Sequence, residues 1–444
     1  MSRAASGVTG TTGEPQLRSH WRRFLGVHAV FGLLYGFFGA YSLLYLGVQL
    51  KAAGMRGSIL DQLLPILGAT MLLDSIIGPF AGNYADARGR RRATTLSLLF
   101  LALSLGCGLL MSAVVFDPGL SFLVFDLGVA AQIFMSLSAA FYATSLDAWW
   151  VDLLHDGQRT PTGSSMHRYF SRQAQVTGLF LVLGGAASLF LGPSLTGGLG
   201  SRFGVGSWET GTRIFWAGIA LCVALAAAIR HGLPLPSRDG RWAMGLADEL
   251  KWKTASAWKL PGLRRALVVT SVVYVCFTAF LYLVPLLLND SSIGVGGGAG
   301  HHWVRENYWI FYLTMGSARF LGPVLSGLIR FEKEGSRRRE FALWASLVCA
   351  SLLATGLAYA FLPFRWIDIA LPLVFLTRVL AEAFKPVQAA YLNELVAWRS
   401  MRAFALSLTT AMGSLFVATI AFVLILEYSL YERALESWAR PAKS

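Results

Sequence analysis

Eleven stretches of this chain are apolar over about 20 residues or more, the length that an α-helix needs to cross ~30 Å of hydrocarbon. The 444 residues are 55% hydrophobic and 14% charged, whereas soluble domains are about 25% charged. Backbone polar groups inside lipid must bond within their own helix, so the sequence predicts an all-α membrane protein. The predicted spans are residues 24–48, 62–83, 94–116, 120–151, 173–199, 212–230, 266–288, 307–329, 341–363, 366–395 and 403–428.

The formal net charge of +14 is concentrated in alternate loops. Arginines precede the first span and follow spans 2, 4, 6, 8 and 10, while the intervening loops are poor in Lys and Arg. This pattern predicts a multi-pass protein of the inner (cytoplasmic) membrane with a cytoplasmic N-terminus, and it argues against nucleic acid as a partner. Eleven spans then place the C-terminus outside. Residues 429–444 are short and charged, so a twelfth helix is predicted to be missing.

The sequence repeats itself with an offset of about 243 residues. Gly78-Pro79 in span 2 matches Gly322-Pro323 in span 8, and Asp152 at the end of span 4 matches Glu394 at the end of span 10. Such internal repeats are a transporter architecture with a site between the halves. We expect an N-terminal half at residues 1–231, a cytoplasmic central loop at 232–265 and a C-terminal half at 266–444. The central loop suits either an amphipathic surface segment or a solvated linker.

The loop after span 2 reads Gly-Asn-Tyr-Ala-Asp-Ala-Arg-Gly-Arg-Arg over residues 82–91. It resembles the signature of the major facilitator superfamily, Gly-x-x-x-Asp-x-x-Gly-Arg-Arg/Lys. The resemblance implies two six-helix pseudo-repeats, in which helices 3, 6, 9 and 12 are peripheral. The missing twelfth helix would then leave a groove facing lipid or a protein partner. For conformational gating the resemblance implicates Gly82, Asp86, Gly89, Arg90 and Asp152, with Asp86 at the start of helix 11.

A second motif lies at the end of span 5, where the sequence resembles the antiporter motif Gly-Pro-x-x-Gly-Gly with one residue inserted. Antiport would favour export. A kinked, closely packed helix end explains the same residues without any antiport. The residues concerned are Gly192, Pro193, Gly197 and Gly198.

Four ionisable residues stand near the middle of predicted spans, where a charge costs about 2.5–3.5 kcal/mol on insertion scales. They are Asp74, Arg319, Arg378 and Glu382. Arg378 and Glu382 are four residues apart and therefore share a helix face. We expect these four residues to handle substrate or protons. Asp74 should face the opposite half, where a contact with Arg319 or Arg378 is either a moving ion pair or a permanent structural bridge.

The sequence contains no nucleotide-binding motif Gly-x-x-x-x-Gly-Lys-Ser/Thr, so energy must come from a gradient. Buried carboxylates favour protons as the coupling ion. The expected partners are a small-molecule substrate, protons and the lipid bilayer, with no cofactor, no metal and no enzymatic activity. The predicted function is secondary active transport by alternating access, with export favoured. The alternative is a non-transporting scaffold or sensor within a membrane complex.

Overall fold

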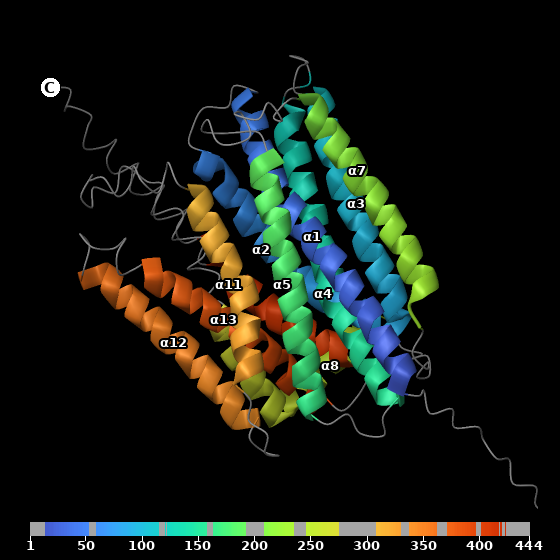
Figure 1. The fold of residues 1–444 in the computed structure, drawn as a ribbon, viewed down its shortest axis with the longest axis vertical. Coiled ribbons are helices and arrows are strands. Elements are labelled where there is room, and N and C mark those ends of the chain that lie inside the picture. Colours follow the sequence, from blue (N-terminus) through green and yellow to red (C-terminus); the bar gives the residue numbers. More distant parts are fainter. Residues whose placement is uncertain are drawn as a thin grey trace, which may run out of the picture.

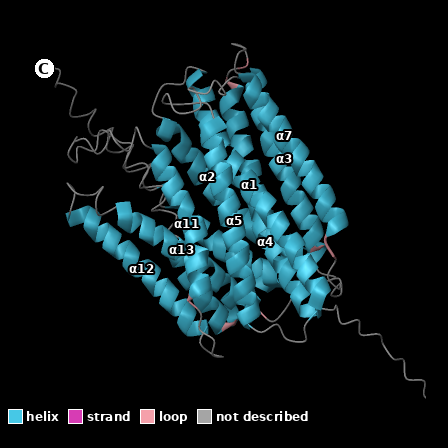
Figure 2. Cartoon of the chain, viewed as in Figure 1, coloured by secondary structure: helices cyan, strands magenta, loops and turns pink. Residues whose placement is uncertain are grey.

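The computed structural model is helical throughout the part that it describes (Figure 2). It describes residues 14–52, 59–114, 120, 122–157, 163–191, 208–234, 246–274, 308–329, 337–361, 371–396, 401–416, 418, 419 and 422. Each of the eleven predicted spans overlaps a helix among these residues. The predicted absence of a twelfth helix concerns residues 429–444, which lie outside the described residues.

Gly89 separates the second helix from the third with a φ of +103°, a conformation that glycine adopts without strain. The elements are α1 (Glu14–Ala52), α2 (Ile59–Arg88), α3 (Arg90–Val114), α4 (Leu123–Gly157), α5 (Gly163–Leu191), α7 (Trp208–Gly232), α8 (Leu246–Lys259), α11 (Tyr308–Leu328), α12 (Arg337–Phe361) and α13 (Leu371–Leu395), with further helices at 261–274 and 402–416.

Four of the described helices contain stretches that are long and apolar enough to cross a bilayer: Arg90–Val114, Leu123–Leu154, Thr212–Gly232 and Arg337–Ala358. Large apolar side chains on their outer faces are exposed, including Leu99, Leu110, Trp216 and Leu353. Exposed apolar surface of this kind is normal where lipid, not water, surrounds the helices. Together with the number of helices, these faces make the chain a multi-pass membrane protein.

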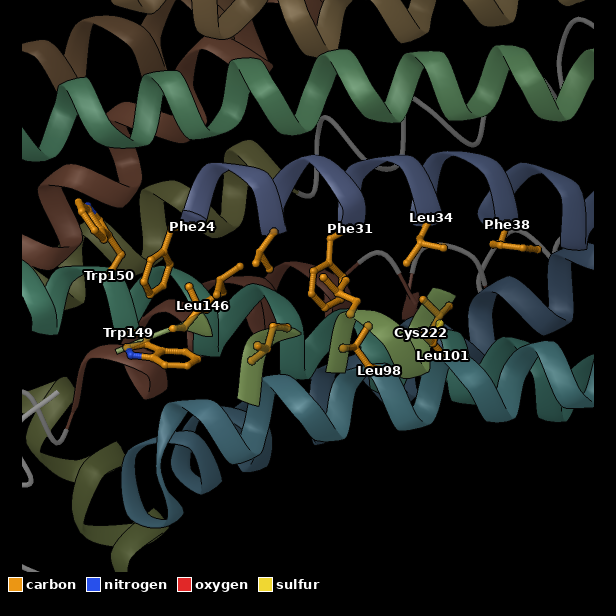
Figure 3. Packing of buried hydrophobic residues seen from close by; sticks show 14 of the residues in the cluster. Phe24, Phe31, Leu34, Phe38, Leu98, Leu101, Leu146, Trp149, Trp150 and Cys222 are labelled. Carbon is orange, nitrogen blue, oxygen red and sulfur yellow. The ribbon is translucent and has the colours of Figure 1, made fainter. Parts of the chain in front are cut away.

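α1, α3, α4, α5 and α7 pack around one apolar core, with α1 alongside α5 and α3 alongside α4 and α7 (Figure 1). In Figure 3, Phe24, Phe31, Leu34 and Phe38 project from one side of α1 toward side chains of α3, α4 and α7. Their spacing of seven, three and four residues places them on a single helix face. A second core joins helix 261–274 to α12, α13 and helix 402–416.

Two close helix contacts join the helices before α8 to those after it. A Cβ on Gly82 of α2 would lie 2.4 Å from Ser407 Oγ, and one on Gly178 of α5 would lie 2.2 Å from the Arg319 carbonyl oxygen of α11. Neither position has room for a side chain, so glycine permits both approaches. Pro323 has no amide hydrogen to donate to that same Arg319 carbonyl, which explains why α5 can approach α11 there.

The central segment contains a helix rather than a solvated linker. α8 lies at the end of the bundle where α1 begins (Figure 1). Charged and apolar residues alternate along it, and its inner face buries Lys253 and Ala257. Within residues 232–265 the structure therefore describes a helix at Leu246–Lys259 that packs against the bundle.

Candidate functional site: two buried charge clusters

Six buried charged residues meet where α8 lies, and we call them the six-charge cluster. Three are acidic and three are basic, so their formal charges balance. They come from α2, α3, α4, α8 and helix 402–416, which lie on both sides of the central segment in the sequence. The members are Asp86, Asp152, Glu249, Arg90, Lys253 and Arg402, and each side chain is at most 7% exposed.

Asp86 is held by three different elements. It pairs with Arg90 one turn further along the chain and accepts a hydrogen bond from Lys253 Nζ at 3.4 Å. It also accepts from the amides of Ala403 and Phe404, at 3.4 and 3.1 Å. These amides belong to the first turn of helix 402–416, where helices leave N–H groups unbonded and attract negative charge. The sequence-based placement of Asp86 at the start of this helix is therefore what the structure shows.

Asp152 of α4 pairs with arginines from two other helices, α3 and helix 402–416. Its Oδ2 accepts a hydrogen bond from Arg90 Nε at 3.2 Å, and its Oδ1 accepts from Arg402 Nη1 at 3.0 Å. The structure thus brings Gly82, Asp86, Arg90 and Asp152 together, with Gly89 at the turn between α2 and α3.

Lys253, Glu249 and Arg402 were not among the predicted site residues. Lys253 is fully buried and donates to Asn83 Oδ1 at 2.7 Å, while Glu249 pairs with it at 2.8 Å. One sequence signal pointed toward them, because Glu249 and Lys253 are four residues apart in a segment that alternates charge with Trp. Arg402 was interpreted only as a loop charge.

A second cluster, the α13 cluster, surrounds Glu382. Its carboxylate lies 2.8 Å from Arg378 Nη2, 2.7 Å from Lys385 Nζ and 3.9 Å from Arg319 Nε. Arg378 and Glu382 are buried, whereas the side chains of Arg319 and Lys385 are 37% and 48% exposed. Three cations therefore share one carboxylate, and two of them reach an accessible surface. Lys385 joins a site that was predicted without it.

Asp74 does not join the α13 cluster among the described ion pairs. Its carboxyl is hydrogen-bonded to Ser136 of α4, within the helices that precede α8. Arg319 and Arg378 both pair with Glu382 instead. The expectation that Asp74 faces the opposite half did not identify α4 as its neighbour. The motif at residues 192–198 lies outside the described residues.

α5 and α11 meet along a line of polar contacts, the polar seam. His167 Nε2 lies 3.1 Å from the Ser326 carbonyl, and Ser171 and Gln175 both donate to the Pro323 carbonyl, at 2.9 and 3.2 Å. A 3.8 Å contact between His167 and Glu340 adds a link to α12. The seam fastens α5 to the helices that follow α8.

The chain was compared with known protein families, sequences and structures. No family model and no curated protein sequence matches the chain. Solved structures match over most of its length, as three of them illustrate. The proton:xylose symporter XylE has a TM-score of 0.61 at 15% identity, covering 92% of this chain and 89% of that one. The fucose:proton symporter FucP of E. coli has a TM-score of 0.61 at 11% identity, covering 93% and 99%. The human organic anion transporter MFSD10 has a TM-score of 0.58 at 16% identity, covering 93% and 94%. The chain therefore has the fold of the major facilitator superfamily.

Proposed function

We propose that this protein is a secondary active transporter that moves a small solute by alternating access. The observation that carries the proposal is the six-charge cluster, which ties helices from both sides of α8 together at one end of the bundle. Removing one partner of a buried ion pair costs about 3–5 kcal/mol, so the cluster holds one state firmly as long as it is intact. Because it is built from discrete ion pairs, it can also separate as a unit when the halves rock. The solved transporters with this fold support the proposal.

The α13 cluster is the proposed substrate site, and we infer that the substrate is an organic anion. The side chains of Arg319 and Lys385 are 37% and 48% exposed, so their cationic groups are accessible beside Glu382. Arginine forms paired hydrogen bonds with carboxylate and phosphate groups, which favours an anionic ligand over a neutral sugar. Asp74 lies elsewhere and is not assigned to this site.

The proposed driving force is the proton gradient, since the sequence has no nucleotide-binding motif. The basic loops support an inner-membrane location with the N-terminus and α8 in the cytoplasm. The six-charge cluster then closes the cytoplasmic side in the state described here. The motif at residues 192–198 is the sequence feature that favours export.

The test is transport by the purified protein in liposomes, using a panel of labelled organic mono- and dianions with neutral sugars as comparison. With an imposed pH gradient, we expect movement of at least one anion and loss of that movement in Arg319→Gln. Arg338→Gln, an exposed arginine at the start of α12, is the matched control and should transport normally. Movement of sugars in preference to anions, unaffected by Arg319→Gln, would contradict the assignment of the site.

A further inference from the structure

A third polar cluster lies among the helices before α8 and has no role in the proposal so far. His28 of α1 is 1% exposed and has polar neighbours on both ring nitrogens. Its Nδ1 lies 2.6 Å from the Tyr142 hydroxyl and 3.3 Å from Gln173 Nε2. Its Nε2 lies 3.4 Å from Asp147 Oδ1 and 3.2 Å from the Tyr169 hydroxyl. Such a group is expensive to bury, which makes it a candidate for function.

These neighbours determine which ring nitrogen carries the hydrogen. The Gln173 amide nitrogen is a donor, so Nδ1 must accept and therefore carries no hydrogen. Nε2 then carries the hydrogen and donates it to the Tyr169 hydroxyl at 3.2 Å, while the Asp147 carboxylate, which only accepts, lies 3.4 Å from the same nitrogen. A doubly protonated His28 would direct an N–H at the Gln173 amide. The geometry therefore fits a neutral histidine beside an acidic residue.

Asp147 differs from Glu382 in its electrostatic surroundings. Glu382 lies within 4 Å of three cations, which favour its charged form. Among the described residues, the ionisable groups that face His28 and Asp147 are Tyr142 from α4 and Tyr169 from α5, and neither is a cation. The Asp147 Oδ1 is buried, and its contact with His28 Nε2 is long. A proton added to Asp147 would neutralise a charge that no cation in this cluster compensates.

We propose that Asp147 is the proton-binding residue of this transporter and that His28 positions it. A proton from water adds to the Asp147 carboxylate and forms one O–H bond, and the same bond breaks when the proton returns to water on the other side. His28 stays neutral throughout. The inference rests on the proposed function, and it transfers the proton role from the residues expected from sequence, Glu382 and Asp74, to a different pair.

α5 gives this site a physical connection to the substrate cluster. Tyr169 and Gln173, four residues apart, face His28. Ser171 and Gln175, offset from these by two residues or about 200°, face α11. The next helix turn brings α5 against the backbone of Arg319, whose side chain pairs with Glu382. A movement of α5 at His28 would therefore also act on α11 at Arg319, and through Arg319 on the α13 cluster.

Asp147 also lies on the same helix as a member of the six-charge cluster. Asp152 follows it by five residues, a rise of about 7.5 Å along α4. Trp149 and Trp150 lie between them, and Phe24 of α1 packs against both rings, with centroid distances of 5.4 and 5.3 Å. The proposed proton site and the six-charge cluster are therefore about 7.5 Å apart along α4, on different faces of that helix. The Asp147 side chain is itself 21% exposed in this structure, whereas His28 is 1% exposed.

The experiment is infrared difference spectroscopy of the purified protein in lipid across a pH titration, which needs no substrate. We expect a carbonyl-stretch band from a protonated carboxylic acid that appears on acidification. Asp147→Asn should remove this band, while Glu382→Gln and Asp126→Asn, an exposed carboxyl on the same helix, should retain it. His28→Gln should displace the midpoint of the band, a signature that a purely structural role for His28 would not produce.

Asp147→Glu is the control for a folding defect in Asp147→Asn. It retains a carboxyl and should give a titrating band at an altered frequency. A band that survives in Asp147→Asn and disappears in Glu382→Gln would overturn the proposal, as would the absence of any titrating band in the wild-type protein. Transport of an anion by a protein whose Asp147 does not titrate would refute this inference alone. Titration of Asp147 in a protein that moves no solute would leave this site intact and refute the proposed function.

Discussion

Glu382→Gln should be the most destabilising single change in the α13 cluster, because this carboxylate is the shared partner of three cations. Arg378 is 4% exposed and loses a carboxylate 2.8 Å away. Breaking a buried pair in this way costs about 3–5 kcal/mol. Arg319 and Lys385 are more than a third exposed, so each of their pairs adds only about 0–1 kcal/mol.

The other substitutions form a graded series. Arg378→Gln should cost less than Glu382→Gln, since the carboxylate keeps Lys385 at 2.7 Å and Arg319 at 3.9 Å. Lys385→Gln should cost about 0–1 kcal/mol. The double change Glu382→Gln, Arg378→Gln should recover much of the single loss, because both buried charges are then removed.

The assay is thermal unfolding in detergent for the three single variants and the double variant, with Arg338→Gln as an exposed control. The ranking Glu382→Gln, then Arg378→Gln, then Lys385→Gln is expected. The reasoning is refuted if Glu382→Gln unfolds at the same temperature as Lys385→Gln, because the carboxylate would then not be compensating a buried charge.

Two further changes test the contacts that join the helices before α8 to α8 itself and to the helices after it. Lys253→Met should loosen the six-charge cluster and so speed thiol labelling of a Ser407→Cys reporter, measured in a background without the native cysteines. Lys251 is exposed on the same helix, so Lys251→Met should leave the labelling rate unchanged. Gly178→Ala should lower the yield of folded protein, since its Cβ would lie 2.2 Å from the Arg319 carbonyl, whereas Gly26→Ala meets no atom within 4 Å and should be tolerated; equal yields of the two alanine variants would show that α5 and α11 do not pack this closely.

Sequence periodicity and the superfamily resemblance were enough to predict the helices and part of the six-charge cluster. Asp86, Arg90 and Asp152 could be placed because their spacing matches a signature with an implied partner at helix 11. Arg378 and Glu382 could be paired because a four-residue spacing fixes their relation on a helix.

The remaining contacts depend on how helices pack, which local spacing does not reveal. Lys253 comes from a segment whose composition suited a linker equally well, and only its burial against Asn83 and Asp86 shows its place. Asp74 shares a helix face with Gly78 and yet contacts Ser136 of α4, because a membrane helix has neighbours on several sides. His28 and Asp147 are 119 residues apart, and nothing in their local sequences indicates that they meet.

Alternating access requires that the end closed by the six-charge cluster also opens, and the most direct measurement is the distance between spin labels at Arg92 and Arg338. Both side chains are exposed, one at the start of α3 and the other at the start of α12. In lipid we expect two distance populations in the wild-type protein. The population with the longer distance should be enriched in the double variant Asp86→Asn, Asp152→Asn and unchanged in Asp126→Asn. A single distance that is identical in all three proteins would contradict a transporter that works by opening this end.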